Sequence, residues 1–132
     1  MKHISAGFGV SFLVCEEKER LYSFGNTNLS LQKDIVNVPT LVKNFTNKVK
    51  QVDCSQNYCA LVTTDGELYS WGSNLCQQTG TESKSKSLSK PTLVSYFNSN
   101  GLKVEQVSCS KGEKHCHTAC VTTNGDAYAW GD

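Results

Sequence analysis

GELYSWGSNLCQQTG, residues 66–80, is the segment that decides the fold. Tyr69 and Trp71 stand two positions apart in a short alternating run, which places both rings on the same face of a strand. Gly72 then permits a tight turn or the close approach of a neighbouring backbone. Polar residues suited to satisfying the backbone groups of a loop follow, namely Asn74, Gln77 and Gln78. The segment therefore predicts the corner of a β-sheet that packs two large rings in one layer.

The same design returns elsewhere in the chain. An aromatic-x-aromatic-Gly motif with a predicted structural role occurs three times, as Tyr22-Ser23-Phe24-Gly25, Tyr69-Ser70-Trp71-Gly72 and Tyr128-Ala129-Trp130-Gly131. Three further pairs of segments match in the same order: residues 49–55 with 104–110, 62–66 with 121–125, and 39–42 with 91–94. Such ordered matches indicate an internal repeat, which constrains the whole fold.

Each repeat is predicted to form short strands, because its side chains alternate with a period of two. The alternation places Val49, Gln51 and Asp53 on one face and Lys50, Val52 and Cys54 on the other. Further strands are predicted over residues 59–63, 68–71 and 91–95, with hairpin turns at Asp65-Gly66 and Asn124-Gly125. A charged connection over residues 15–20 replaces the glycine turn in the first repeat. No segment sustains the apolar spacing of a helix.

Units of about 50 residues with four antiparallel strands are typical of β-propeller blades, so we predict an all-β fold. The repeated residues resemble the regulator of chromosome condensation repeat family. The second unit carries its pattern at Val49, Val52, Cys54, Asp65, Gly66, Tyr69, Trp71, Gly72, Asn74 and Gly80. The third carries it at Val104, Val107, Cys109, His117, Thr118, Ala119, Gly125, Tyr128, Trp130 and Gly131. The chain departs from the pattern at Val10, Phe24, Ser55, Tyr58 and Ser110.

The resemblance implies an incomplete propeller, because the propellers of this family have seven blades and the chain holds about three. We expect one partial module over residues 1–132, with units at approximately 1–44, 45–97 and 98–132, the third of them incomplete. The sequence is therefore expected to be part of a longer protein. The remaining blades would come from that longer chain or from self-association.

The resemblance implies a non-enzymatic module that binds a protein partner, or alternatively a guanine-nucleotide exchange factor, or part of one, for a Ran-type small GTPase. Two loops are the predicted contact regions. Cys109 to Val121 spans 12 positions where Cys54 to Val62 spans 8, so the third unit has a longer loop, which contains Lys111, Glu113 and Lys114. The polar loop over residues 79–90 adds Lys84 and Lys86, although its composition favours a solvated connection between strands.

The segment HCHTAC, residues 115–120, is rich in zinc ligands and in possible nucleophiles. On a strand, however, Cys116 and Cys120 lie about 13 Å apart, which is too far for one metal ion. Cys116 and His117 point to opposite faces, which disfavours a catalytic pair. We therefore predict a structural strand here, and no catalytic residue, cofactor or metal. The seven cysteines are expected to be small buried thiols.

Composition excludes several classes of function. Thirteen basic and twelve acidic side chains give no basic footprint for direct nucleic-acid binding. No apolar run approaches the roughly 20 residues of a membrane helix. Residues 1–15 make a poor signal peptide, because glycines and serines interrupt their apolar stretch. We therefore expect a cytoplasmic or nuclear location and no membrane partner.

Overall fold

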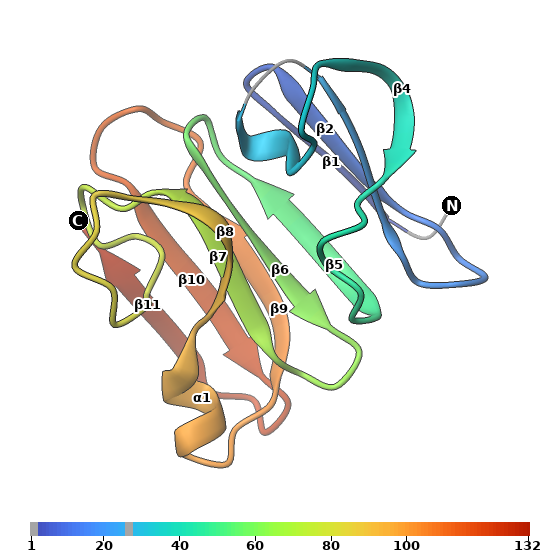
Figure 1. Ribbon diagram of the computed structural model, residues 1–132. Coiled ribbons are helices and arrows are strands. Elements are labelled where there is room, and N and C mark those ends of the chain that lie inside the picture. The colour runs from blue at the N-terminus through green and yellow to red at the C-terminus, as the bar shows by residue number, and fades with distance from the viewer. Residues whose placement is uncertain (1–2, 26–27) are drawn as a thin grey trace.

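Three antiparallel sheets, each formed by consecutive strands, lie next to one another (Figure 1). This computed structural model describes residues 3–25 and 28–132, so Met1, Lys2, Asn26 and Thr27 of the first predicted unit lie outside the described residues. The first sheet contains β1 (His3–Gly7), β2 (Val10–Val14), β3 (Leu21–Gly25) and β4 (Val36–Leu41), in that spatial order. A short 3-10 helix, η1 (Asn28–Ser30), lies between β3 and β4.

The second and third sheets repeat this order. The second contains β5 (Val49–Cys54), β6 (Tyr58–Thr63), β7 (Leu68–Ser73) and β8 (Ser87–Leu93). A single helical turn, α1 (Ser95–Ser99), leads to the third sheet of β9 (Val104–Cys109), β10 (His117–Thr122) and β11 (Ala127–Gly131). The strands β1, β5 and β9 lie side by side from sheet to sheet. Among the residues described, no helix has the length and apolar character needed to cross a bilayer.

The hairpins form where the turn chemistry predicts them. Gly66 and Gly125 have φ values of +83° and +92°, a conformation that glycine adopts without steric cost. The amide of Gly66 donates to the carbonyl of Thr63 (3.0 Å), and that of Gly125 donates to the carbonyl of Thr122 (3.0 Å). These turns run from Thr63 to Gly66 and from Thr122 to Gly125, and they set the register of β6 with β7 and of β10 with β11.

The aromatic rings of the repeat fill the core between neighbouring sheets. Trp71 is 1% exposed and packs edge to face on Phe12 of the first sheet, with ring centroids 5.6 Å apart. Its indole nitrogen donates to the carbonyl oxygen of Leu29 (2.9 Å). Trp130 repeats this contact one sheet later, because its indole donates to the carbonyl of Gln78 (3.0 Å). The tryptophan before Gly72 and the tryptophan before Gly131 therefore each hold their sheet to the loop of the preceding one.

Polar side chains of the inner strands make a second set of links. The Gln51 amide nitrogen donates to the carbonyl of Val107 (2.7 Å), and its oxygen accepts from the Val107 amide (2.8 Å). The Asp53 carboxylate accepts from the Cys109 amide (2.7 Å). Earlier in the chain, Ser5 takes the position of Asp53, and its hydroxyl accepts from the Cys54 amide (3.2 Å). The two junctions therefore share one geometry with different side chains.

The alternation predicted for residues 49–54 is wrong at its first position. A register shift between Val49 and Gln51 in the pairing of β5 with β6 changes which face the next residues occupy. Val49 consequently packs in the same core cluster as Val52 and Cys54. A β-bulge of this kind inserts one residue into a strand, and the hydrophobic pattern alone does not reveal it.

The fourth strand of the second sheet also differs from its prediction over residues 91–95. β8 already begins at Ser87 and ends at Leu93, so Pro91 lies inside an edge strand, where a missing amide hydrogen is tolerated. Ser95 begins α1, a single turn whose Phe97 is 2% exposed. Burial of one ring, rather than an apolar helical period, stabilises this turn, and the sequence therefore gave no helical signal.

Replacing Trp71 by Ala should lower the free energy of unfolding by about 3–5 kcal/mol, the usual range for a buried aromatic side chain. The change removes the ring packed on Phe12 and leaves the Leu29 carbonyl without its donor. Urea denaturation followed by circular dichroism gives the measurement. The matched change Trp130→Ala should cost less, because part of that ring is exposed. Equal midpoints for the parent and the Trp71 variant would contradict the packing role.

Candidate functional site

The loops that emerge at one end of the three sheets form a continuous candidate surface (Figure 1). It comprises residues 7–10, 55–58, 74–86 and 110–116, and we call it the hairpin face. The Ser73 amide donates to the carbonyl of Asn57 (2.8 Å), which places the start of the 74–86 loop beside the 55–58 hairpin, and the Gln56 amide nitrogen donates to the Glu113 carboxylate (2.9 Å), which links that hairpin to the 110–116 loop. All five predicted partner-contact residues, Lys84, Lys86, Lys111, Glu113 and Lys114, belong to this face.

Two of these residues also link the second and third sheets. Lys111 donates its ammonium group to the Asp53 carboxylate (2.7 Å) and to the Cys54 carbonyl (2.8 Å), while 61% of its side chain stays exposed. The Glu113 carboxylate accepts from the Gln56 amide nitrogen (2.9 Å). The longer loop of the third unit is therefore fixed to the neighbouring hairpin. An exposed ion pair of this type contributes at most about 1 kcal/mol, so Lys111 remains replaceable.

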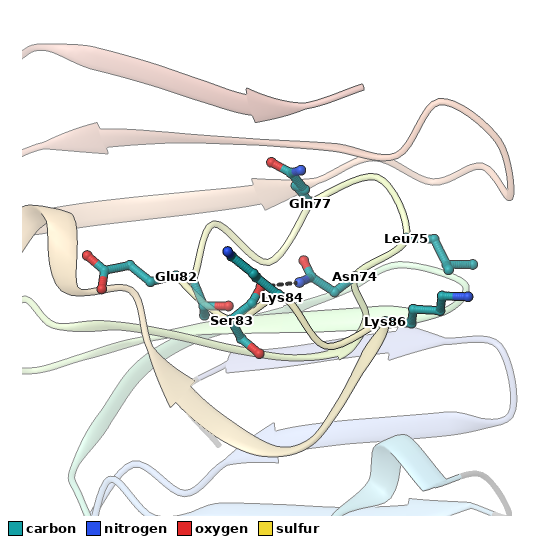
Figure 2. A pocket seen from close by; sticks show the side chains of 8 residues that line it. Asn74, Leu75, Gln77, Glu82, Ser83, Lys84 and Lys86 are labelled. Carbon is teal, nitrogen blue, oxygen red and sulfur yellow. Dashed lines mark hydrogen bonds between the residues drawn. The ribbon is translucent and has the colours of Figure 1, made fainter.

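Lys84 and Lys86 line a separate hollow of about 600 Å³ on the same face. Asn74 organises the loop around it, as Figure 2 shows. The Asn74 amide nitrogen donates to the carbonyls of Ser83 and Ser85 (3.1 Å each), and its oxygen accepts from the Thr79 hydroxyl (2.6 Å). Asn74 therefore satisfies the loop backbone as its sequence position predicts, and the two lysines are left at the rim.

Two exposed apolar side chains on the hairpin face were not predicted as contacts. Phe8, at the tip of the first hairpin, and Leu75, after β7, are each 70% exposed. Phe8 also lines a hollow of about 420 Å³ together with Asn57 and Leu88. A large side chain between Gly7 and Gly9 is a sequence signal of an exposed turn.

The HCHTAC segment forms part of a strand, as predicted. β10 begins at His117, and Cys116 comes directly before it. The Cys116 thiol contacts the Asn57 side chain (3.9 Å) and the Glu113 carbonyl (3.5 Å), whereas His117 donates toward the carbonyl of His115 (3.0 Å). Among the described residues, no three His, Cys, Asp or Glu side chains are grouped so that they could hold a metal ion.

Five of the seven cysteines are buried, as predicted, whereas Cys15 and Cys76 are partly exposed, so the prediction is wrong for these two. Burial raises the pKa of the Cys59 thiol well above its usual range, and its contact with the Cys54 thiol adds to this effect. Burial, followed by the Asp53 carboxylate, also raises the pKa of Cys109 strongly. Burial alone raises the pKa of Cys120 to about 11. These thiols are therefore neutral at physiological pH and poor nucleophiles.

Two sequence profiles of one family match the chain. Regulator of chromosome condensation (RCC1) repeat profiles cover residues 65–121 and residues 49–78. The E3 ubiquitin-protein ligase HERC2 of Homo sapiens is 35% identical over 99 residues, which are 71% of this chain and 2% of that protein. The Regulator of chromosome condensation of Drosophila melanogaster is 44% identical over 57 residues, which are 43% of this chain and 10% of that protein. The chain thus spans a small fraction of these relatives.

Solved structures show the same fold. Human WBSCR16 superposes with a TM-score of 0.75 at 25% identity, covering 97% of this chain and 32% of that one. Prp20p of Saccharomyces cerevisiae, described with its binding properties to Gsp1p and histones, superposes with a TM-score of 0.67 at 22% identity. That match covers 82% of this chain and 28% of Prp20p. The predicted all-β fold of partial propeller blades is therefore confirmed.

Burial of the thiols predicts a strict order of alkylation. In the native chain at about pH 8, iodoacetamide should label the partly exposed Cys15 and Cys76 first. Cys59, Cys109 and Cys120 should remain unlabelled until denaturant is added, because their raised pKa values leave little thiolate and burial blocks access. Peptide mapping by mass spectrometry distinguishes the sites. Rapid labelling of Cys59 in the folded chain would refute its core position.

Proposed function

This chain belongs to the regulator of chromosome condensation (RCC1) repeat family, and from that membership we propose that it is a non-enzymatic module that binds a protein partner through its hairpin face. One observation supports the proposal: the segments that carry the predicted contact residues and the exposed Phe8 and Leu75 are different strand connections that emerge at the same end of the sheets. Loops of unequal length on a rigid set of sheets are a common way to select a partner. The remaining blades would come from a longer chain or from self-association.

The chemistry of the hairpin face favours a partner surface of mixed character. Lys84, Lys86 and Lys114 provide positive charge, while Phe8 and Leu75 provide apolar anchors. Interfaces commonly combine a few apolar anchors with a charged rim that improves specificity. Such a partner would carry acidic side chains around a shallow apolar surface. We propose that this binding takes place in the cytoplasm or the nucleus.

The alternative function is guanine-nucleotide exchange on a Ran-type GTPase. Its support is the fold shared with Prp20p, a protein studied for its binding to Gsp1p. An exchange factor must bind the nucleotide-free GTPase more tightly than the loaded form, since only differential affinity shifts such an equilibrium. On the hairpin face, Lys111 and Glu113 already contact Asp53 and Gln56 of the second sheet. We therefore rank exchange below the interaction module.

The proposed interaction through the hairpin face can be tested by substituting two matched sets of three lysines. Lys84, Lys86 and Lys114 change to Gln on the hairpin face, and Lys18, Lys48 and Lys103 change to Gln at the opposite end of the sheets. The two variants lose equal charge. Affinity enrichment with quantitative mass spectrometry should find proteins that the hairpin-face variant loses and the control retains, and titration with the purified partner should reproduce the loss. If the parent and both variants retained the same set of bound proteins, the hairpin face would not be the binding surface.

Exchange activity is tested directly by release of a fluorescent guanine nucleotide from a Ran-type GTPase in a stopped-flow instrument. We expect catalytic amounts of residues 1–132 to leave the release rate unchanged, because no group on the hairpin face is dedicated to displacing magnesium or phosphate. The control is release by excess EDTA, which shows that the nucleotide can leave. Saturable acceleration, lost when Lys111, Glu113 and Lys114 are replaced, would place exchange above the interaction module.

A further inference from the structure

Three lysines from separate segments line one cavity between the first and second sheets. Lys33 follows η1, Lys43 follows β4, and Lys90 lies within β8. The cavity measures about 460 Å³, and we call it the lysine cleft. Its other lining residues are neutral: Asn28, Leu31, Gln32, Asn44 and Ser89. The described part of this lining therefore contains positive charge and hydrogen-bonding groups, and no carboxylate.

The lysines of the cleft are not explained by contacts within the chain. All three are exposed, and within residues 3–25 and 28–132 none forms an ion pair with an acidic side chain. Like charges that share a cavity repel one another, so their convergence does not stabilise the fold. A negatively charged ligand would remove this repulsion.

The internal repeat shows that the fold itself does not need lysine at these positions. The hydroxyls of Ser23 and Ser70 donate to the carbonyls of Ser30 and Thr79, which fixes how the two loops correspond. The repeated Pro-Thr-Leu-Val segment fixes the fourth strands in the same way. The residues equivalent to Lys33, Lys43 and Lys90 are Glu82, Ser95 and Val38. The equivalent position in the other repeat is thus occupied by an acidic residue for Lys33, a small one for Lys43 and an apolar one for Lys90.

A cavity of about 330 Å³ between the second and third sheets is not the counterpart of the lysine cleft. Its lining is apolar and aromatic, namely Gly80, Val94, Tyr96, Phe97, Tyr128, Ala129 and Trp130. Tyr128, Ala129 and Trp130 correspond to Tyr69, Ser70 and Trp71 of β7, which pairs with β8 in the second sheet. The described third sheet contains β9, β10 and β11, so no described residue there is equivalent to Ser89 or Lys90.

We propose that the lysine cleft binds a multiply charged anion carried on an extended segment of a protein partner. The anion is a phosphorylated side chain or a cluster of carboxylates, because lysine ammonium groups act as point charges toward either group. The cavity volume suits a single side chain with its flanking backbone. Nucleic acid fits less well, since no aromatic side chain lines the cleft for stacking on a base and the whole chain carries a net charge of only +1. The three lysines lie outside the segments that define the hairpin face, although Asn28 and Ser89 line both the cleft and the hollow beside Phe8. The proposal does not depend on the function of that face.

The test uses fluorescence anisotropy with four labelled probes. They are a short Gly/Ser peptide with adjacent phosphoserines, the same peptide with a run of glutamates, the unmodified peptide, and a DNA duplex. The proteins are the full chain, the variant with Lys33, Lys43 and Lys90 changed to Gln, and a control with Lys18, Lys48 and Lys103 changed to Gln. The two variants lose the same charge.

We expect at least one anionic peptide to bind the parent and the control equally, and to bind the cleft variant about tenfold or more weakly, in line with the loss of several exposed charge contacts. The unmodified peptide should not bind, and added salt should weaken binding. The anionic peptide that binds identifies the source of the charge. A second variant, Lys33→Glu, Lys43→Ser and Lys90→Val, places the repeat's own equivalents at the cleft and should also lose binding.

Three results would overturn the proposal: equal binding of the anionic peptides by the parent and the cleft variants, binding of the DNA duplex alone, or no binding of either anionic peptide. Unchanged thermal melting of each variant shows that a lost interaction reflects the cleft and not unfolding. Because the hairpin-face lysines stay intact in every protein used, failure of this test leaves the proposed function of that face unaffected.

Discussion

One contact between neighbouring sheets organises the structure: the ring before the motif glycine packs under the preceding sheet and donates its indole hydrogen to a loop carbonyl there. Trp71 reaches Leu29 in this way, and Trp130 reaches Gln78. The contact satisfies a buried polar group while burying a large apolar surface, so it fixes both the distance and the angle between the sheets. Gly72 is needed beside it, because a Cβ there would come within 2.6 Å of the Asn57 carbonyl oxygen.

The inner strands depend on this arrangement and reinforce it. Once the sheets are stacked, Gln51 pairs with the backbone of Val107, and Asp53 caps the amide of Cys109. Asp53 also accepts a hydrogen bond from Lys111. The same carboxylate therefore contacts both the inner strand β9 and the longest loop of the third unit. A loop that has four extra positions by sequence is thereby held against its neighbour. This loop is therefore ordered before any partner binds, which reduces the conformational entropy lost on binding.

The hairpin face and the lysine cleft illustrate how one repeat supports different surfaces. Both lie on connections or edges, where side chains are free to vary because the core contacts are made elsewhere. The hairpin face combines lysines with exposed Phe8 and Leu75. The lysine cleft combines three lysines with neutral amides. The two surfaces adjoin, because Asn28 and Ser89 line both the cleft and the hollow beside Phe8.

The sequence alone determined the strand type, the hairpin turns and the aromatic layer, since these depend on period-two alternation, on turn glycines and on residues close together in the chain. It also predicted the strand at HCHTAC and the burial of five of the seven cysteines. The bulge after Val49, the early start of β8 and the turn around Phe97 needed tertiary contacts, because each reflects packing against a neighbour. The lysine cleft was likewise invisible in the sequence: Lys33, Lys43 and Lys90 are distant along the chain, and only the stacking of two sheets brings them to one cavity.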